Sequence, residues 1–141
     1  YRFNPRWSGF ASIGYVDTEF DEFVDNSLGD LSGLPFPEAP EWNAALGAFY
    51  QHPRGFFAGA DAKYVSRYLA RFGADPQEYV DGYTVTNARL GLRADGWTVT
   101  LYSENVFERD YYVYNDRNTS GDVAATLGPR RVTALSVEME F

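Results

Sequence analysis

Alternation of apolar and polar positions recurs along this chain and predicts β-strands rather than helices. Successive side chains of a strand point to opposite faces of a sheet, so a strand between two environments shows a period of two. The clearest case is the segment 56–69, in which one face carries Phe56, Ala58, Ala60, Ala62, Tyr64 and Tyr68. The opposite face carries Asp61, Lys63 and Arg67. Such a strand would lie between an apolar and a polar environment.

Six extended segments of this kind are expected, each rich in aromatic or β-branched residues and bounded by Gly or Pro. They span residues 7–20, 42–51, 56–69, 82–93, 97–107 and 131–141. The last segment alternates from Arg131 onward and ends on Phe141. An aromatic residue in that place suits the closing strand of a barrel that ends at an aromatic girdle.

The connections between these segments alternate in length. Residues 52–55 and 94–96 make tight turns, of which His52 is expected to be part, whereas residues 21–41, 70–81 and 108–130 make long loops. Bacterial outer-membrane barrels have short periplasmic turns and longer extracellular loops. The inner edge of the predicted sheet then carries Trp7, Tyr50, Phe56, Trp97 and Phe141. The outer edge carries Trp42, Tyr68 and Tyr83.

The fold class that follows is all-β, an antiparallel up-and-down transmembrane β-barrel segment of about six strands. Because eight strands are the usual minimum for a spanning barrel, this barrel would be incomplete. Alternation alone does not decide the point, since an antiparallel sheet packed on a soluble core shows the same pattern. A soluble β-sandwich or lipocalin-like binding module, or a surface barrel without transport, therefore stay open as alternatives.

Composition narrows the classes of function. The chain has no Cys, so it has no disulfide framework or thiolate metal site. Its net charge of -8 comes from one segment, because residues 17–41 hold eight acidic residues and neither Lys nor Arg. No basic stripe is available to neutralise phosphates, which argues against nucleic acid as a partner. No signal peptide is visible at the N-terminus, and no catalytic motif appears, so no enzyme activity or cofactor is expected.

Several local patterns, in order, resemble the C-terminal barrel portion of a TonB-dependent outer-membrane receptor. They are NPRW followed by SGFASIGYVDTEF, LSGLPFPEAPEW, YTVTNARLGLR, SENVFERDYYVY, GPRR and the terminal Phe. The third pattern corresponds to the family's "n-a-r-l-g" strand, and the fourth to its "N-l-f-d" motif, with Val106 and Glu108 as mild departures. The resemblance covers almost the whole chain.

The resemblance implies a role in import. Residues 1–141 would be a fragment of the receptor barrel, without the plug domain and the coupling box (TonB box) that such receptors carry. The intact receptor would lie in the bacterial outer membrane, in contact with its lipid. It would bind a scarce nutrient such as a ferric siderophore, cobalamin or a glycan, and would depend on its own plug and on TonB.

Candidate substrate contacts lie in the predicted extracellular loops. They are Asp21, Phe23, Asp25, Tyr114, Asn115 and Arg117. The acidic loop could offer oxygen ligands to Ca²⁺ but lacks the spacing of an EF-hand, so a solvated loop is the simpler interpretation and no metal site is predicted. Residues expected to face the lumen are Asp61, Lys63, Arg67, Arg89 and Glu138. Contact with a plug or substrate path is one role for them, and cross-strand ion pairing is the expected one. Phe141 would be the barrel-closing terminus.

Overall fold

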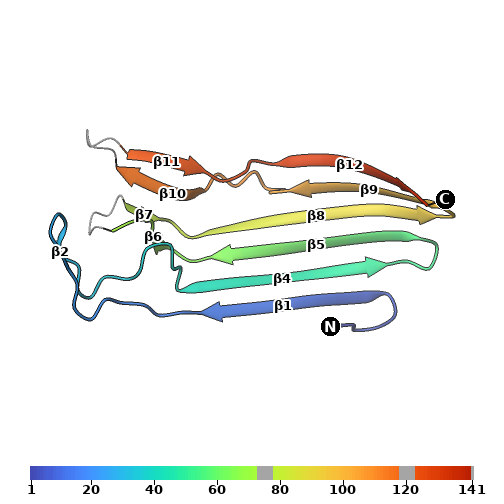
Figure 1. Cartoon of the computed structure of the whole chain (residues 1–141). Helices are drawn as coiled ribbons and strands as arrows, with labels where there is room; N and C mark the ends of the chain where they lie inside the picture. The colour runs from blue at the N-terminus through green and yellow to red at the C-terminus, as the bar shows by residue number, and fades with distance from the viewer. Residues whose placement is uncertain (73–77, 118–122, 141) are drawn as a thin grey trace.

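A computed structural model describes residues 1–72, 78–117 and 123–140 of the chain. Six strands form one antiparallel sheet in the order β1-β4-β5-β8-β9-β12 (Figure 1). Their bounds are β1 Trp7–Tyr15, β4 Trp42–Gln51, β5 Phe56–Val65, β8 Tyr83–Ala94, β9 Trp97–Glu104 and β12 Val132–Met139. Within the described residues, no helix is long and apolar enough to cross a membrane.

The prediction of six antiparallel strands in an unclosed barrel segment is confirmed. A sandwich would need a second layer, and the six strands make a single layer (Figure 1). Three strands end earlier than the alternation indicated, at Tyr15, Val65 and Glu104. After Val65, the Ser66 hydroxyl accepts a hydrogen bond from the Trp42 backbone N–H at 3.0 Å.

The register of the sheet places one continuous apolar surface on one face. Residues directly opposite each other share a face, as do Phe56 and Leu92, or Leu90 and Leu101. The large apolar side chains of this face are between 40% and 74% exposed, so no described part of the chain covers them. They are Trp7, Ile13, Tyr15, Trp42, Leu46, Phe56, Tyr64, Leu90, Leu92, Trp97, Leu101, Leu135, Val137 and Met139. We call this surface the apolar face and the opposite one the polar face.

Aromatic residues mark both edges of the apolar face. At the turn edge, Trp7 and Tyr50 are paired across β1 and β4, with ring centroids 4.9 Å apart. At the loop edge, Tyr15 and Trp42 are paired with centroids 4.5 Å apart. The outer belt therefore differs from the predicted one, because it holds Tyr15 and Tyr64 beside Trp42, while Tyr68 lies beyond the end of β5. Phe141 lies outside the described residues.

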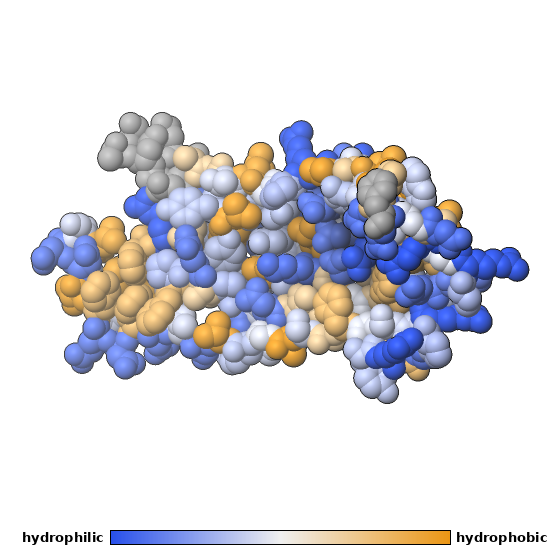
Figure 2. All heavy atoms as spheres, turned by 45° about the vertical axis from the view of Figure 1, so that its right-hand side comes forward, coloured by the Kyte–Doolittle hydropathy of each residue, from blue (hydrophilic) through white to orange (hydrophobic). Residues whose placement is uncertain are grey.

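The turn edge is compact. The expected turn at 52–55 closes through the His52 N–H to Phe56 carbonyl bond of 2.6 Å, and Gly55 adopts a positive φ of 89°. A further turn precedes β1, where the Asn4 side-chain oxygen accepts from the backbone N–H groups of Arg6 and Trp7 at 2.8 and 2.9 Å. This turn was not predicted from the sequence. Figure 2 shows hydrophilic side chains gathered at this end of the molecule, which comes forward in that view.

The loop edge carries three small hairpins that the sequence did not predict. They are β2 Val24–Asp25 with β3 Gly29–Asp30, β6 Tyr68–Leu69 with β7 Tyr79–Val80, and β10 Tyr112–Arg117 with β11 Val123–Leu127. Four of the most deeply buried apolar residues, Leu31, Leu69, Ala70 and Val80, lie within or beside these hairpins at 3% exposure or less. The best-packed part of the chain is therefore the folded loop region and not the sheet.

Candidate ligand-binding site

The three long connections at the loop edge fold onto one another. The Glu38 N–H donates to the Leu69 carbonyl at 2.7 Å, which joins the first connection to β6. The Tyr68 hydroxyl donates to the Val113 carbonyl at 2.6 Å, and the Asn115 side-chain amide donates to the Tyr79 carbonyl at 2.8 Å. These last two bonds attach β10 to the β6–β7 hairpin. The described parts of all three connections therefore form one unit above the sheet.

An aromatic cluster supports the first of these connections. The rings of Phe20 and Phe36 lie 4.5 Å apart, and those of Phe20 and Phe23 lie 5.0 Å apart. Phe72 from the second connection joins them at 5.8 Å from Phe20. Phe23, a predicted ligand contact, is thus a member of this cluster, and the remaining exposure of its side chain is 37%.

The acidic residues of the first connection shape its turns. Asp25 accepts hydrogen bonds from the backbone N–H groups of Ser27 and Leu28 at 2.7 and 2.9 Å. Asp30 accepts one from the Ser32 N–H at 3.0 Å, and these bonds to Ser32 lower the pKa of its carboxyl. Asp21 is exposed. In the described ranges, no group of three or more His, Asp or Glu side chains is arranged to hold a metal ion.

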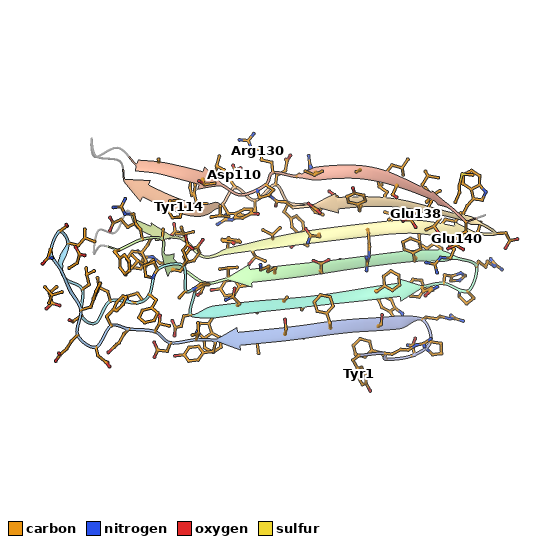
Figure 3. All side chains as sticks on the ribbon, viewed as in Figure 1. Tyr1, Asp110, Tyr114, Arg130, Glu138 and Glu140 are labelled. Atoms are coloured by element: carbon orange, nitrogen blue, oxygen red, sulfur yellow. The ribbon has the colours of Figure 1, made fainter. Side chains whose placement is uncertain are left out.

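A cavity of about 320 Å³ lies on the polar face where the sheet meets the folded loops. Its walls come from β4, β5, β8, the first connection, β6 and β10, and its polar side chains are Glu38, Asn43, Lys63, Tyr68, Tyr83 and Tyr114. Lys63 is the only lysine of the chain and forms no ion pair with any described residue. Figure 3 shows Tyr114 at the loop end of the sheet, far from Glu138 and Glu140 at the turn end.

Two tyrosines of this cavity, Tyr68 and Tyr83, are held in place by contacts with the third connection. Tyr83 stacks on Tyr111 with centroids 4.3 Å apart, and Tyr68 is fixed by its bond to Val113. Burial raises the pKa of Tyr68 above its usual 10.0, with smaller contributions from Tyr83 and Glu38, and burial likewise raises that of Tyr111. Burial therefore favours the neutral phenol at Tyr68 and at Tyr111. Together they offer flat rings and hydroxyls beside one ammonium group, which suits an anionic ligand with aromatic or oxygen-rich groups.

The remaining predicted residues are distributed along the polar face. Asp61 accepts a hydrogen bond of 2.8 Å from the Asn87 amide, and the Arg89 guanidinium lies 5.1 Å from the centre of the Phe49 ring. Alternation on β12 puts Glu138 on this face as well. Arg67 lies past the end of β5, with its guanidinium 4.2 Å from the centre of the Tyr79 ring. That the polar face lines a barrel lumen stays a prediction.

Two of the predicted loop contacts, Asn115 and Arg117, are not placed in the cavity by the described residues. Asn115 joins β10 to β7, as described above, and the side chain of Arg117 lies outside the described part of the chain. Of the six predicted contacts, Tyr114 is the one that lines the cavity.

Sequence reasoning missed Tyr68 and Tyr83 as members of this site. Tyr68 was expected on the apolar face because the alternation of β5 was extended past Ser66. The register pairs Tyr83 with Val65, which places it on the polar face with Lys63. Odd-numbered residues of β5 and β8 share the polar face, but this can be read from the sequence only once the pairing of the two strands is known.

Asn105, the first residue of the motif that resembles the family's "N-l-f-d", has a structural role that the sequence did not show. Only 2% of it is exposed, and its backbone has a positive φ of 48°. Its side-chain amide donates to the carbonyls of Arg109 and Pro129 at 2.9 and 3.1 Å, and its side-chain oxygen accepts from the Arg109 N–H at 2.9 Å. Asn105 thus ties the start of the third connection to its end.

Comparison with known proteins identifies what this arrangement resembles. Residues 1–106 match the family model described as TonB dependent receptor-like, beta-barrel. The closed form of the ferric-catecholate import receptor Fiu from E. coli K12 matches 99% of the chain at 25% sequence identity, with a TM-score of 0.77. The ferric yersiniabactin uptake receptor FyuA from Yersinia pestis matches 100% of the chain at 20% identity, with a TM-score of 0.78. The siderophore receptor PiuA from Acinetobacter baumannii matches 98% of the chain at 18% identity, with a TM-score of 0.76.

The matched region is a limited part of each of these solved structures. The chain covers 19% of the Fiu chain, 22% of the FyuA chain and 20% of the PiuA chain. At the identities of FyuA and PiuA the likeness concerns the fold alone.

Proposed function

The chain belongs to the TonB-dependent receptor β-barrel family of the bacterial outer membrane, and on this premise we propose that it forms wall and ligand site in a receptor that imports ferric siderophores. The apolar face would contact outer-membrane lipid, and the polar face would line the lumen. The folded connections would lie outside the cell, because short turns of such barrels are periplasmic.

The cavity beneath the folded connections is the observation that carries the ligand class. Its tyrosine rings offer stacking surfaces for aromatic chelating groups, and Lys63 offers a positive charge for an anionic complex. The likeness to a receptor named for ferric catecholates supports the same class, because a ferric catecholate combines aromatic rings with negative charge.

Import would depend on parts of the intact receptor beyond this chain. A plug domain within the barrel and TonB in the cell envelope are the partners that family membership suggests. The residues described here would bind and guide the ligand, and transport rather than catalysis is the proposed activity.

Replacing Lys63 and Tyr114 in the full-length receptor tests this proposal. Binding of a ferric tris-catecholate to the purified receptor is expected to weaken about threefold to tenfold in Lys63→Gln, because a charge contact within the site is lost. Tyr114→Phe is expected to weaken binding less, since it loses only a hydroxyl.

The exposed Arg130, which lies outside this cavity, gives a matched control, because Arg130→Gln also removes one positive charge. Unchanged binding in that variant would separate the site from the overall charge. If the wild-type receptor binds no ferric catecholate, ferric citrate or ferric hydroxamate, the proposed function is wrong.

A further inference from the structure

Three positively charged side chains follow one line along the polar face from the loop edge to the turn edge. Lys63 lies opposite Val85 of β8, and Arg89 and Arg93 follow on β8 itself. The three levels are therefore four residues apart, or about 13 Å at the rise of a strand. All three side chains are exposed on the face that carries the cavity. We call these residues the basic line.

Each member of the basic line borders a hollow, in the polar face for Lys63 and Arg89 and at the turn edge of the sheet for Arg93. Lys63 lines the cavity under the loops. Arg89 lines two hollows of about 360 and 300 Å³ in the middle of the sheet, one beside Phe10 and Phe49 and one beside Tyr102. Arg93 lines an open cavity of about 1630 Å³ at the turn edge. Hollows lined by a positively charged side chain therefore follow one another along the strands, from the loop edge to the turn edge.

The turn-edge cavity concentrates positive charge. Besides Arg93 it is lined by Arg2, Arg6 and Arg54, and among the described residues of its lining Asp95 is the one with a carboxylate. This is notable in a chain whose net charge is -8. The turn-edge end of the basic line is thus broad, because four arginines line its cavity.

Cross-strand ion pairs, expected from the sequence, do not occupy these cations. None of Lys63, Arg89 and Arg93 lies within ion-pair distance of a described carboxylate. The one carboxylate on the polar face of β5 and β8 is Asp61, which accepts a hydrogen bond from Asn87 and lines both Arg89 hollows. Glu104 borders one of these hollows, and Glu38 lines the cavity of Lys63. Carboxylates thus share the hollows, but none of the three cations is held in an ion pair with a described residue.

We propose that the basic line guides an anionic ferric complex from the outer cavity, past Arg89, to the arginines of the turn edge. The proposal rests on the proposed import function and adds the side of the barrel that the anionic complex follows and the residues that guide it. A row of separated cations lowers the energy of an anion at each level without one tight site that would hold it. Electrostatic guidance of this kind acts on rates and weakens with added salt.

The test uses the full-length receptor in cells and measures surface binding and uptake of radiolabelled iron separately. The two probes are an anionic ferric tris-catecholate and a neutral ferric tris-hydroxamate. In Arg89→Gln and Arg93→Gln, uptake of the catecholate is expected to fall about threefold to tenfold, while binding stays near that of the wild type. Arg89→Lys and Arg93→Lys should restore uptake, and Arg130→Gln should leave it unchanged.

The outcomes separate this proposal from the function on which it rests. If the receptor binds and imports the catecholate but Arg89→Gln and Arg93→Gln import it at the wild-type rate, the basic line is refuted and the import function stands. An equal fall in uptake of the neutral hydroxamate would also overturn guidance by charge, and would indicate that these arginines position a plug or the wall. If the wild-type receptor binds neither of these probes nor ferric citrate, the import function itself is refuted.

Discussion

The ring of Phe57 on β5 lies against Gly91 on β8, the residue directly opposite it in the register. A Cβ atom placed on Gly91 would overlap the Phe57 ring and also the Val99 carbonyl. The same relationship recurs across the next two strand pairs, where Phe49 lies opposite Gly59 and Phe10 lies opposite Gly47. The polar face is therefore built on three cross-strand Phe–Gly pairs, in which each ring takes the space that a side chain would fill.

Replacement of Gly91 by Ala is expected to destabilise the barrel by about 1–3 kcal/mol, because the added methyl group overpacks a site closed by ring and backbone. The temperature at which the full-length receptor loses its folded band on seminative gels measures this effect. Gly14→Ala is the matched control, since a Cβ there would meet only the Asn43 carbonyl at 3.9 Å. Equal melting of the two variants would show that the Phe57 ring moves away without cost.

The sheet could be predicted from the sequence because a period of two is a local property of each strand. The face on which Phe56, Ala58 and Ala60 lie follows from the alternation within their own strand, without knowledge of any neighbouring strand. The Phe–Gly pairs could not be predicted, because they depend on the register between strands far apart in the chain. Gly91 and Phe57 are separated by an entire connection, and nothing near either residue indicates the other.

The candidate site was predicted in part for a related reason. Tyr114 was named as a substrate contact from loop composition, and Lys63 was named from strand alternation only as a lumen-facing residue; both line the cavity beneath the folded connections. Tyr68 was misplaced because the strand ends at Val65, where Ser66 and Trp42 form a bond that no periodicity reveals. The hydrogen bonds of Asn105, which we call the Asn105 hub, were likewise not predicted, because its partners Arg109 and Pro129 lie at opposite ends of one long connection.

Asn105 is expected to hold the third connection in its folded form. Asn105→Ala removes three side-chain hydrogen bonds, leaves the Pro129 carbonyl without this donor and places Ala at positive φ, so a loss of about 2–4 kcal/mol is expected. Limited proteolysis of the full-length receptor in the membrane, followed by identification of the cut sites, measures the opening of residues 105–131.

Asn105→Gly separates the two causes, because glycine adopts the same backbone conformation at little cost but also lacks the hydrogen bonds. Cleavage in Asn105→Gly should lie between that of the wild type and that of Asn105→Ala. Resistance equal to the wild type in both variants would mean that the hub does not stabilise the connection.

The folded connections are expected to loosen at alkaline pH. The pKa of Tyr68 is raised above 10.0 in the folded state by burial, so the folded state favours the neutral phenol. Its contribution to stability is therefore complete below the unfolded pKa and is lost as pH rises through the folded pKa. Protease resistance of the loop region should fall in this alkaline window, and an ultraviolet titration of tyrosinate should show a late-titrating group that Tyr68→Phe removes.

Tyr112→Phe is a suitable control for the loss of a hydroxyl, because its ring is 47% exposed and no hydrogen bond of its hydroxyl joins it to a described residue. At neutral pH, Tyr68→Phe should reduce the protease resistance of the β6–β7 and β10 region, since the bond to the Val113 carbonyl is worth about 0.5–1.5 kcal/mol. If Tyr112→Phe has the same effect, the Tyr68 bond is not what joins these elements.

The direction of the chain across the membrane gives the last prediction. Asp21 lies in a long connection and Asp95 in a tight turn, and both are exposed at opposite edges of the sheet. Since short turns face the periplasm, a large membrane-impermeant maleimide should label Asp21→Cys on intact cells and Asp95→Cys only after the outer membrane is opened. The segment itself has no cysteine, so any background label would come from elsewhere in the receptor. Labelling of Asp95→Cys on intact cells would show that the sheet has the opposite orientation. The arginines of the turn edge would then lie outside the cell, and the cavity beneath the folded connections could not be the entry site.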